Sequence, residues 1–311
     1  MNDTARFPVI ADRLSKSFTD KPVLTNLDLA IEPGTVLGLL GANGSGKTTL
    51  IKCLLGLLRP SGGQATVFGD PAWDLSAATK ERIGYVPQEV ATYPWMRVRH
   101  VIDYTAAFYP KWNRQLVADL CQRWRLPLDD RSGTLSVGQL QTLGIVLAMG
   151  HEPELLILDE PVASLDPSAR REFLRMLIDL VDHPNRTVLF STHITSDLER
   201  VASKIALLRE GHIEFCGDLD LLKDRVKRLR IMADHDLPAS FGIAGALSCQ
   251  VDGRMAVATV ADLSPDDIEA IRTTWKADVT VSDLNLEEIF VELHEHNAPR
   301  LAETELTGAI G

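Results

Sequence analysis

The sequence predicts an α/β fold in which a parallel sheet carries an antiparallel edge subdomain, an inserted helical subdomain and a small C-terminal α+β domain. Three observations support this prediction: solidly apolar runs that suit strands covered on both faces, an early stretch that alternates apolar and polar residues, and a separate, acidic C-terminal part. With 311 residues and 45% hydrophobic content, the chain is long enough for two domains with substantial cores.

The strands of the expected sheet follow from two residue patterns. Leu27, Leu29 and Ile31 alternate with other residues and end at Pro33-Gly34, which is typical of a half-buried strand at an antiparallel edge. Four later runs are apolar throughout, as in parallel strands covered by helices on both faces. These runs are Val36 to Leu40, Leu155 to Leu158, Val188 to Phe190 and Ile205 to Leu208.

Between positions 89 and 150 the pattern changes to that of helices. Leu116, Leu120 and Trp124 stand four residues apart, and Pro127 follows them as a helix stop. We therefore expect an inserted helical subdomain over about residues 89–150.

The C-terminal part, residues 231–311, is expected to be a separate small α+β domain after a larger domain of residues 1–230. Asp252-Gly253 predicts a hairpin turn, Pro265 to Trp275 a helix and Ala277 to Val281 a strand. This part holds 4 Lys/Arg against 15 Asp/Glu, whereas the larger domain holds 28 of each sign. Because a negative surface repels phosphate backbones, no nucleic-acid partner is expected.

Other features of the chain bound its class. The basic stretch Lys223 to Arg230 is interpreted as a solvated helix face. The four cysteines stand far apart without metal-ligand spacing, as in the core of a reduced, cytosolic protein. No apolar run approaches the roughly 18 residues of a membrane span, and the N-terminal residues lack the order of a signal peptide. Any membrane role would therefore need a partner.

A phosphate-binding motif, G-A-N-G-S-G-K-T at Gly41 to Thr48, lies between an apolar strand and a helical stretch. In this spacing, backbone N–H groups point at phosphate oxygens, Lys47 reaches the terminal phosphates and the Thr48 hydroxyl binds Mg²⁺. The following helix N-terminus also favours anions. The sequence thus predicts a P-loop NTPase that binds a nucleoside triphosphate. The residues expected in the cradle are Gly41, Asn43, Gly44, Ser45, Gly46, Lys47, Thr48 and Thr49.

Two carboxylates directly follow the apolar run that ends at Leu158. Asp159 suits orientation of the Mg²⁺ shell, and Glu160 suits polarisation of the attacking water, because phosphoryl transfer needs positioning and charge stabilisation more than covalent chemistry. An acidic pair at a strand end is common in isolation. Beside a phosphate cradle, it predicts a catalytic role.

Four further segments resemble those of the ATP-binding cassette (ABC) family. These are Leu135-Ser-Val-Gly-Gln139 for the L-S-G-G-Q signature, Ser164-Leu-Asp-Pro167 for the D-loop, Ser191-Thr-His193 for the switch histidine and Ile83-Gly-Tyr-Val-Pro-Gln88 for the Q-loop. Phe18 stands where the family stacks an aromatic ring on adenine, a contact worth ~1–3 kcal/mol in other base stacks. The resemblance covers about residues 7–230.

The resemblance implies an ATPase that pairs head to tail with a second copy of itself or with a paralogous cassette. Each copy would complete its neighbour's site across ATP. The implied catalytic residues are Glu160, His193, Gln88 and Lys47, and the implied Mg²⁺ residues are Thr48, Gln88 and Asp159. Besides the phosphate cradle, the implied nucleotide contacts are Phe18, Ser136, Gly138, Gln139 and Asp166.

Two departures from the family pattern affect the signature. Val137 stands where the family usually has glycine, and the arginine usual shortly after the signature is replaced within Gln139 to Thr142. Because Ser136 and Gly138 are intact, hydrolysis is still expected.

The leading functional hypothesis is the ATPase subunit of a membrane transporter, cytoplasmic and peripheral on the inner membrane beneath a separate integral membrane permease. Tyr93 and Trp95 follow Gln88, where family members dock their permease, although these aromatics equally suit a subdomain core. The segment Leu284 to Leu293 resembles the end of bacterial exporter-type cassettes, which favours export. The alternatives are a soluble mechanochemical ATPase that acts on nucleic acid or ribosomes, and a regulatory nucleotide-binding module with little turnover.

Overall fold

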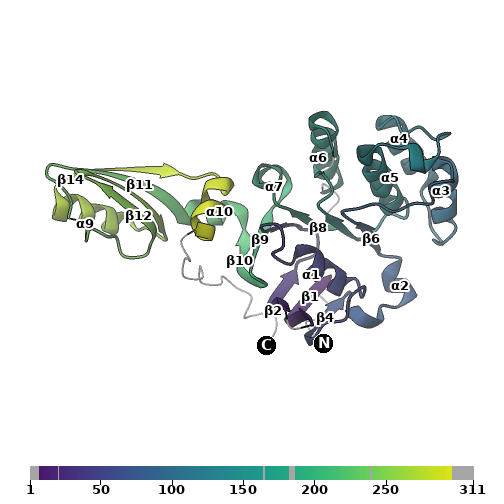
Figure 1. Ribbon diagram of the computed structural model, residues 1–311, viewed down its shortest axis with the longest axis horizontal. Helices are drawn as coiled ribbons and strands as arrows, with labels where there is room; N and C mark the ends of the chain where they lie inside the picture. Colours follow the sequence, from purple (N-terminus) through teal and green to yellow (C-terminus); the bar gives the residue numbers. More distant parts are fainter. Residues whose placement is uncertain (1–6, 20, 164, 182–185, 239, 296–311) are drawn as a thin grey trace. The chain divides into compact units, whose positions relative to one another are not determined.

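The computed structural model describes residues 7–19, 21–163, 165–181, 186–238 and 240–295. The chain divides into two compact units, and the second of them begins at Gly217 (Figure 1). The sequence had placed this boundary at position 230, which lies inside the strand β11 (Val226–Ala233). Because β11 pairs with two strands of the second unit, the contacts assign the whole strand to that unit.

The first unit contains a six-stranded sheet with the strand order β10-β9-β3-β8-β7-β6. The strands are β3 (Val36–Leu40), β6 (Ile83–Val86), β7 (Leu155–Asp159), β8 (Thr187–Thr192), β9 (Lys204–Arg209) and β10 (His212–Asp218). The pairs of β3 with β8 and β9, and of β7 with β6 and β8, are parallel. β3, β7 and β8 are buried along their whole length, as the apolar runs predicted.

An antiparallel sheet with the order β2-β1-β4-β5 forms the edge subdomain of the same unit. Its strands are β1 (Val9–Phe18), β2 (Lys21–Ile31), β4 (Gly62–Val67) and β5 (Asp70–Pro71). Helix α1 (Lys47–Leu54) joins the two sheets, because Leu50 and Ile51 share one core cluster with Leu14 of β1 and Leu39 of β3. The start of α1 is therefore fixed against both sheets.

The helices of the first unit include three that form the expected helical subdomain, seen together beside β6 in Figure 1. These three are α3 (Val98–Ala106), α4 (Arg114–Arg123) and α5 (Val137–Met149). The others are α2 (Ala77–Lys80), α6 (Pro167–Val181) and α7 (Thr195–Val201), with the short 3-10 helices η2 (Ala72–Asp74) and η3 (Ser132–Thr134). In α4 the buried stripe comprises Val117, Leu120 and Cys121.

The aromatic residues that follow Gln88 do not belong to the core of the helical subdomain. The side chains of Tyr93 and Trp95 are 44% and 68% exposed, and the rings lie with centroids 5.4 Å apart. Tyr93 also contacts Tyr104 of α3, which in turn contacts Phe108. All four rings are exposed, so the core interpretation is wrong for these aromatic residues, although Val98 and Val101 of α3 are buried.

The second unit is a four-stranded antiparallel sheet with the order β12-β13-β11-β14. Its further elements are α8 (Leu219–Arg225), β12 (Ala246–Asp252), β13 (Met255–Ala261), α9 (Pro265–Trp275), β14 (Ala277–Asp283) and α10 (Leu286–Glu295). Asp252-Gly253 forms the predicted hairpin turn, and Gly253 has the positive φ of 56° that such a turn favours. The predicted helix and strand after it are α9 and β14.

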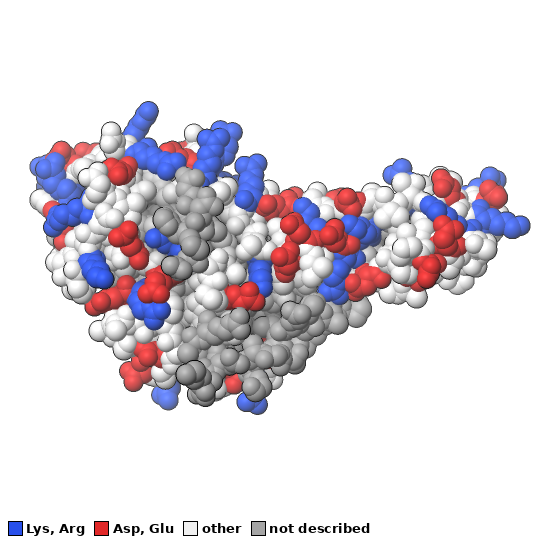
Figure 2. Space-filling view, turned by 180° about the vertical axis from the view of Figure 1, so that it is seen from behind, with Lys and Arg blue, Asp and Glu red and all other residues white. Residues whose placement is uncertain are grey.

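The basic stretch of this unit is a helix face only in part, because Lys227, Arg228 and Arg230 lie on β11. The expectation of a helix over the whole stretch is therefore wrong. Lys227 Nζ lies 2.8 Å from Asp283 Oδ1, and Arg228 pairs with Glu288 of α10 at 2.7 Å. On the face shown in Figure 2, basic and acidic side chains of the unit are interspersed. These basic residues thus serve pairing within the unit.

None of the helices in the described part of the chain is both long enough and apolar enough to cross a bilayer.

Shortening the buried side chain of Leu50 in α1 is predicted to destabilise the first unit. Leu50→Ala removes a fully buried side chain from the cluster that joins the two sheets, which costs about 2–5 kcal/mol of unfolding free energy. Equilibrium urea unfolding measures this loss. The matched control is Leu57→Ala, because Leu57 is 58% exposed, and its change is expected within about 0.5 kcal/mol. Equal losses in both variants would contradict the packing argument.

Candidate nucleotide-binding and hydrolysis site

The phosphate loop connects the buried end of β3 to the start of α1. Gly46 caps α1 with a φ of 112°, a conformation open to glycine but costly for other residues. A Cβ on Gly41 would lie 2.5 Å from the backbone oxygen of Leu208, so a side chain there would collide with the neighbouring strand. No side chain caps the N–H groups of the first turn of α1. These free donors, together with the helix dipole, favour an anion at this point.

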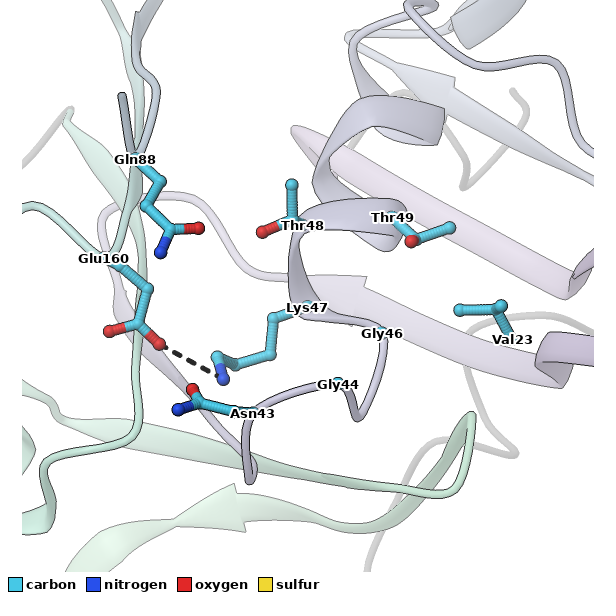
Figure 3. Close-up of a pocket in the computed structure, with 9 residues that line it drawn as sticks. All are labelled: Val23, Asn43, Gly44, Gly46, Lys47, Thr48, Thr49, Gln88 and Glu160. Carbon is cyan, nitrogen blue, oxygen red and sulfur yellow. Dashed lines mark ion pairs between the residues drawn. The ribbon is translucent and has the colours of Figure 1, made fainter. Parts of the chain in front are cut away.

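An open pocket of about 160 Å³ lies over this loop (Figure 3). Eight of its nine lining residues were predicted from the sequence, and the ninth is Val23. The predicted eight are Asn43, Gly44, Gly46, Lys47, Thr48, Thr49, Gln88 and Glu160. In Figure 3, Gln88 and Glu160 face Lys47 and Thr48 across the pocket. Gln88 and Glu160 are thus brought to the phosphate loop from distant parts of the chain.

Lys47 is buried, and its ammonium group has two hydrogen-bond acceptors and one ion-pair partner. Nζ donates to the backbone oxygens of Gly41 at 2.7 Å and Ala42 at 3.3 Å, and lies 3.1 Å from Glu160 Oε1. An ammonium group has three donors, and two of them are used by these carbonyl oxygens. The ion pair is nearly closed to solvent, because the side chains of Lys47 and Glu160 are 6% and 5% exposed.

Glu160 has a charged neighbour at one carboxylate oxygen and a hydrogen-bond partner at the other. Oε1 faces Lys47, while Oε2 lies 2.9 Å from Nδ1 of His193, which directly follows β8. Glu160 has a positive φ of 50°, a backbone conformation that costs of order 1–3 kcal/mol in a residue other than glycine. This turn at the end of β7 directs the side chain towards Lys47. The arrangement suits a carboxylate that accepts a proton from a water molecule placed in the pocket.

Asp159 is fully buried one residue earlier, at the end of β7. Its Oδ1 accepts a hydrogen bond from Ser191 Oγ at 2.8 Å, whereas Oδ2 has no hydrogen-bond partner among the described residues. Buried carboxylate oxygens are normally bonded, so the orphaned Oδ2 suits a ligand that the chain itself does not supply. Burial raises the pKa of Tyr85 to about 12, and the nearby negative charge of Asp159 contributes to a smaller extent.

The residues present fit Mg²⁺. This ion prefers oxygen ligands and is usually bound through one or two carboxylates together with substrate phosphates. The candidate ligand groups in the pocket are the Thr48 hydroxyl and the Gln88 side chain. A third candidate is Asp159 Oδ2, which has no hydrogen-bond partner among the described residues and belongs to the residue directly before Glu160. No cluster of three or more His, Cys, Asp or Glu residues is found in the described ranges.

Comparison with known proteins agrees with this geometry. A sequence model of the family described as ABC transporter matches residues 24–163. The Nod factor export ATP-binding protein I of Burkholderia pseudomallei (strain 1710b) is 32% identical over 209 residues, which cover 66% of this chain and 68% of that protein. The chain belongs to the ABC transporter family. This confirms the predicted family and fold, and with them the assignment as an ATP-binding ATPase of the ABC class.

Two further comparisons show the extent of the likeness. A solved structure described as the ATP binding subunit of an ABC transporter superposes with a TM-score of 0.64 at 27% identity, over 70% of this chain and 92% of that one. An uncharacterized ABC transporter ATP-binding protein of Synechocystis sp. is 34% identical over 208 residues. The alignment covers 63% of this chain and only 56% of the length of that relative.

The signature segment of this ABC protein forms the N-terminus of α5. Ser136 Oγ accepts from the Gln139 N–H at 3.2 Å, and Gln139 Oε1 accepts from the Ser136 N–H at 2.9 Å, which completes a capping box. Val137 follows with 65% of its side chain exposed. Neither Ser136, Gly138 nor Gln139 lines the pocket of its own chain.

The remaining predicted residues, Asp159 and His193 among them, do not line the pocket. Phe18, at the end of β1, is 45% exposed, and Lys16 Nζ lies 4.9 Å from the centroid of its ring. Asp166 caps α6, since its Oδ1 accepts from the N–H groups of Ser168 and Ala169. Ser164 lies outside the described residues. Gly41 and Ser45 shape the loop without lining the pocket.

Sequence reasoning missed the roles of two residues. Val23 reaches the pocket from β2, a neighbour that no motif indicates. Ser191 bonds both Asp159 and Glu160, and its only sequence signal is a polar residue placed two positions before the switch histidine. Both contacts depend on strand neighbours, which a single sequence does not reveal.

Loss of the phosphate-loop lysine is predicted to weaken ATP binding. Lys47→Ala removes a charge partner of the phosphates, and a hydrogen bond to a charged group contributes about 1.5–3 kcal/mol, so affinity should fall about 10- to 100-fold. Isothermal titration with ATP measures the change. Lys52→Ala is the control, because Lys52 lies in the last turn of the same helix, away from the pocket. Equal ATP affinity of Lys47→Ala and the parent would contradict the assignment of Lys47.

Proposed function

We propose that this chain is the ATP-hydrolysing subunit of an ABC transporter and that it couples ATP-driven dimerisation and hydrolysis to export through a separate membrane permease. The observation that carries the proposal is Glu160, whose buried carboxylate lies between Lys47 and His193 at the edge of the phosphate loop. The arrangement supports a role for Glu160 as proton acceptor, because Glu160 and Lys47 line the same pocket and His193 contacts the carboxylate from beside it.

The chemistry follows from the positions of these groups. The free N–H groups at the start of α1 and the ammonium of Lys47 bind phosphate oxygens of ATP. Glu160 accepts a proton from the attacking water, and His193 Nδ1 holds the other carboxylate oxygen and so fixes the direction of the acceptor. Bound Mg²⁺ would neutralise phosphate charge beside Thr48, Gln88 and Asp159.

A second copy is proposed to complete the site. The pocket is open and contains no residue of the signature, while Ser136 and Val137 stand exposed at the N-terminus of α5. A helix start attracts phosphate through its dipole and N–H groups, although the Gln139 N–H of α5 is already capped by Ser136 Oγ. A head-to-tail pair, formed with an identical or a paralogous cassette, would place the start of α5 on the γ-phosphate of the opposite site. ATP then stabilises the pair, and hydrolysis removes the acceptor that holds it together.

The permease is proposed to dock on the exposed aromatic surface formed by Tyr93, Trp95, Tyr104 and Phe108. Tyr93 and Trp95 follow Gln88 closely in sequence, and their rings continue through Tyr93 to Tyr104 and Phe108. Aromatic residues are enriched in protein interfaces. The export direction is supported by the sequence of α10 and by the relative named for Nod factor export. Through such a permease the chain would be peripheral on the cytoplasmic face of the inner membrane.

Neutralising the catalytic carboxylate is predicted to separate binding from hydrolysis. Glu160→Gln keeps the size of the side chain but removes the proton acceptor, so ATP binding persists while steady hydrolysis falls to background. With hydrolysis blocked, the ATP-bound pair should accumulate as a dimer in size-exclusion chromatography with MgATP. Hydrolysis at the parent's rate would remove Glu160 from the catalytic role. A monomer at saturating MgATP would instead overturn the proposed pairing.

Loss of an exposed aromatic is predicted to weaken permease association. Trp95→Ala removes the more exposed member of the Tyr93–Trp95 pair, so a detergent-extracted membrane protein should co-purify at lower yield while ATPase activity of the isolated chain stays unchanged. Trp73→Ala is the matched control, because Trp73 is also an exposed tryptophan, outside this surface. Co-purification of nucleic acid or ribosomes in place of a membrane protein would favour a soluble mechanochemical ATPase.

A further inference from the structure

Ser191 is a fully buried residue of β8 whose Cα lies opposite that of Asp159 on the neighbouring strand β7. Its hydroxyl makes two hydrogen bonds: Oγ donates to Asp159 Oδ1 at 2.8 Å and accepts from the Glu160 N–H at 3.0 Å. A hydroxyl has one proton and an amide N–H can only donate, so the proton of Ser191 must point to the carboxylate. The direction of both bonds is therefore determined.

For Asp159, this bond distinguishes the two carboxylate oxygens. Oδ1 is held by Ser191, whereas Oδ2 is buried without a hydrogen-bond partner in the described ranges. Rotation of the carboxylate would break the bond to Ser191, and an unmade bond to a buried charged group costs more than an ordinary one. Ser191 therefore fixes which oxygen stays available to a ligand.

For Glu160, the same hydroxyl supports the turn that directs the catalytic side chain. The Glu160 N–H is shared between the backbone oxygen of Ser191 at 3.1 Å and its Oγ. The residue adopts a positive φ of 50°, and such a conformation persists only where its surroundings hold it. The second acceptor on this N–H is one such restraint.

We propose that Ser191 is a positioning residue that couples the two carboxylates of the site, holding Asp159 for the Mg²⁺ shell and Glu160 for the attacking water through one hydroxyl. This inference rests on the proposed function, in which Asp159 orients Mg²⁺ and Glu160 activates water. Ser191 itself touches neither ATP nor water in this role. Its removal should therefore act on the dependence of ATP binding on Mg²⁺ rather than on the contact of ATP with the phosphate loop.

The test compares ATP binding to the full chain by isothermal titration over a series of Mg²⁺ concentrations and in EDTA. The parent should bind ATP more tightly with Mg²⁺. In Ser191→Ala, the Mg²⁺ concentration that gives half of this gain should rise about 10- to 100-fold, as is typical when a residue that orients a metal ligand is removed. Affinity for ATP in EDTA should stay unchanged, because the phosphate loop is intact.

The matched control is Thr187→Val. Thr187 lies at the other end of β8, is 1% exposed, and its hydroxyl accepts from the Gly34 N–H at 3.1 Å, so this variant also removes one buried hydroxyl from the same strand. Its Mg²⁺ dependence should match that of the parent. A shift of equal size in Thr187→Val would assign the effect of Ser191→Ala to general loosening of β8 and would overturn the proposal.

Two further variants separate the possible failures. Ser191→Cys keeps nearly the same volume but offers only a weak donor, so it should shift the Mg²⁺ dependence even where Ser191→Ala does not fold. Asp159→Asn should lose the Mg²⁺-dependent gain outright. If Asp159→Asn loses it while folded Ser191→Ala and Ser191→Cys keep the parent's Mg²⁺ dependence, the inference on Ser191 is wrong and the proposed site stands. If the parent itself shows no gain, the proposed Mg²⁺ site fails.

Discussion

The buried ion pair between Lys47 and Glu160 is the interaction on which the site depends. Both side chains are almost fully removed from solvent, and a buried charge is tolerated only when it is paired and hydrogen-bonded. Here the ammonium has two further carbonyl acceptors and the carboxylate has His193 on its other oxygen, so neither charge is left uncompensated. In the proposed function, phosphate oxygens compete with Glu160 for the same ammonium. Arrival of ATP thus redistributes the partners of Lys47 and leaves the carboxylate available to water, with His193 still in contact.

The sheet explains how four distant segments meet at this pair. The strands β3, β8, β7 and β6 are neighbours in that order and run parallel, so their carboxyl ends lie along one edge. The phosphate loop follows β3, His193 follows β8, Glu160 follows β7, and Gln88 lies two residues after β6. Ligands of open α/β sheets bind at the carboxyl ends of the strands. The apolar runs that bury these strands on both faces thereby also hold the polar residues at their ends in register.

Much of this arrangement could be predicted from the sequence, because its signals are local. The phosphate loop, the carboxylates after an apolar run and the hairpin turn at Asp252-Gly253 each follow from a few adjacent residues. Contacts between neighbouring strands could not be predicted. Val23 and Ser191 make such contacts, and no residue near them in the sequence indicates their partners. The basic stretch shows a related limit. Charged residues on a strand resemble those on a helix until their partners are known, and Lys227 and Arg228 find theirs on β14 and α10. Exposure of Tyr93 and Trp95 was undecided for the same reason, since aromatic residues suit a core and an interface alike.

One ion pair gives the proposed head-to-tail arrangement a physical link from the D-loop to the switch histidine. Asp166 caps α6, and Arg170, one turn further on, donates two hydrogen bonds to Asp197 Oδ1 at 2.9 and 2.7 Å. Asp197 is 3% exposed and lies on α7, four residues after His193. The Arg170 side chain is 28% exposed, but removing it would leave the buried carboxylate of Asp197 without its cation, which is costly. Displacement of α6 by a neighbouring copy would therefore have one of two results. Either the ion pair between Arg170 and Asp197 breaks, or α7 moves together with the segment that holds His193 against Glu160. Because breaking the pair is costly, the proposed function couples contact at the D-loop to the orientation of the Glu160 carboxylate.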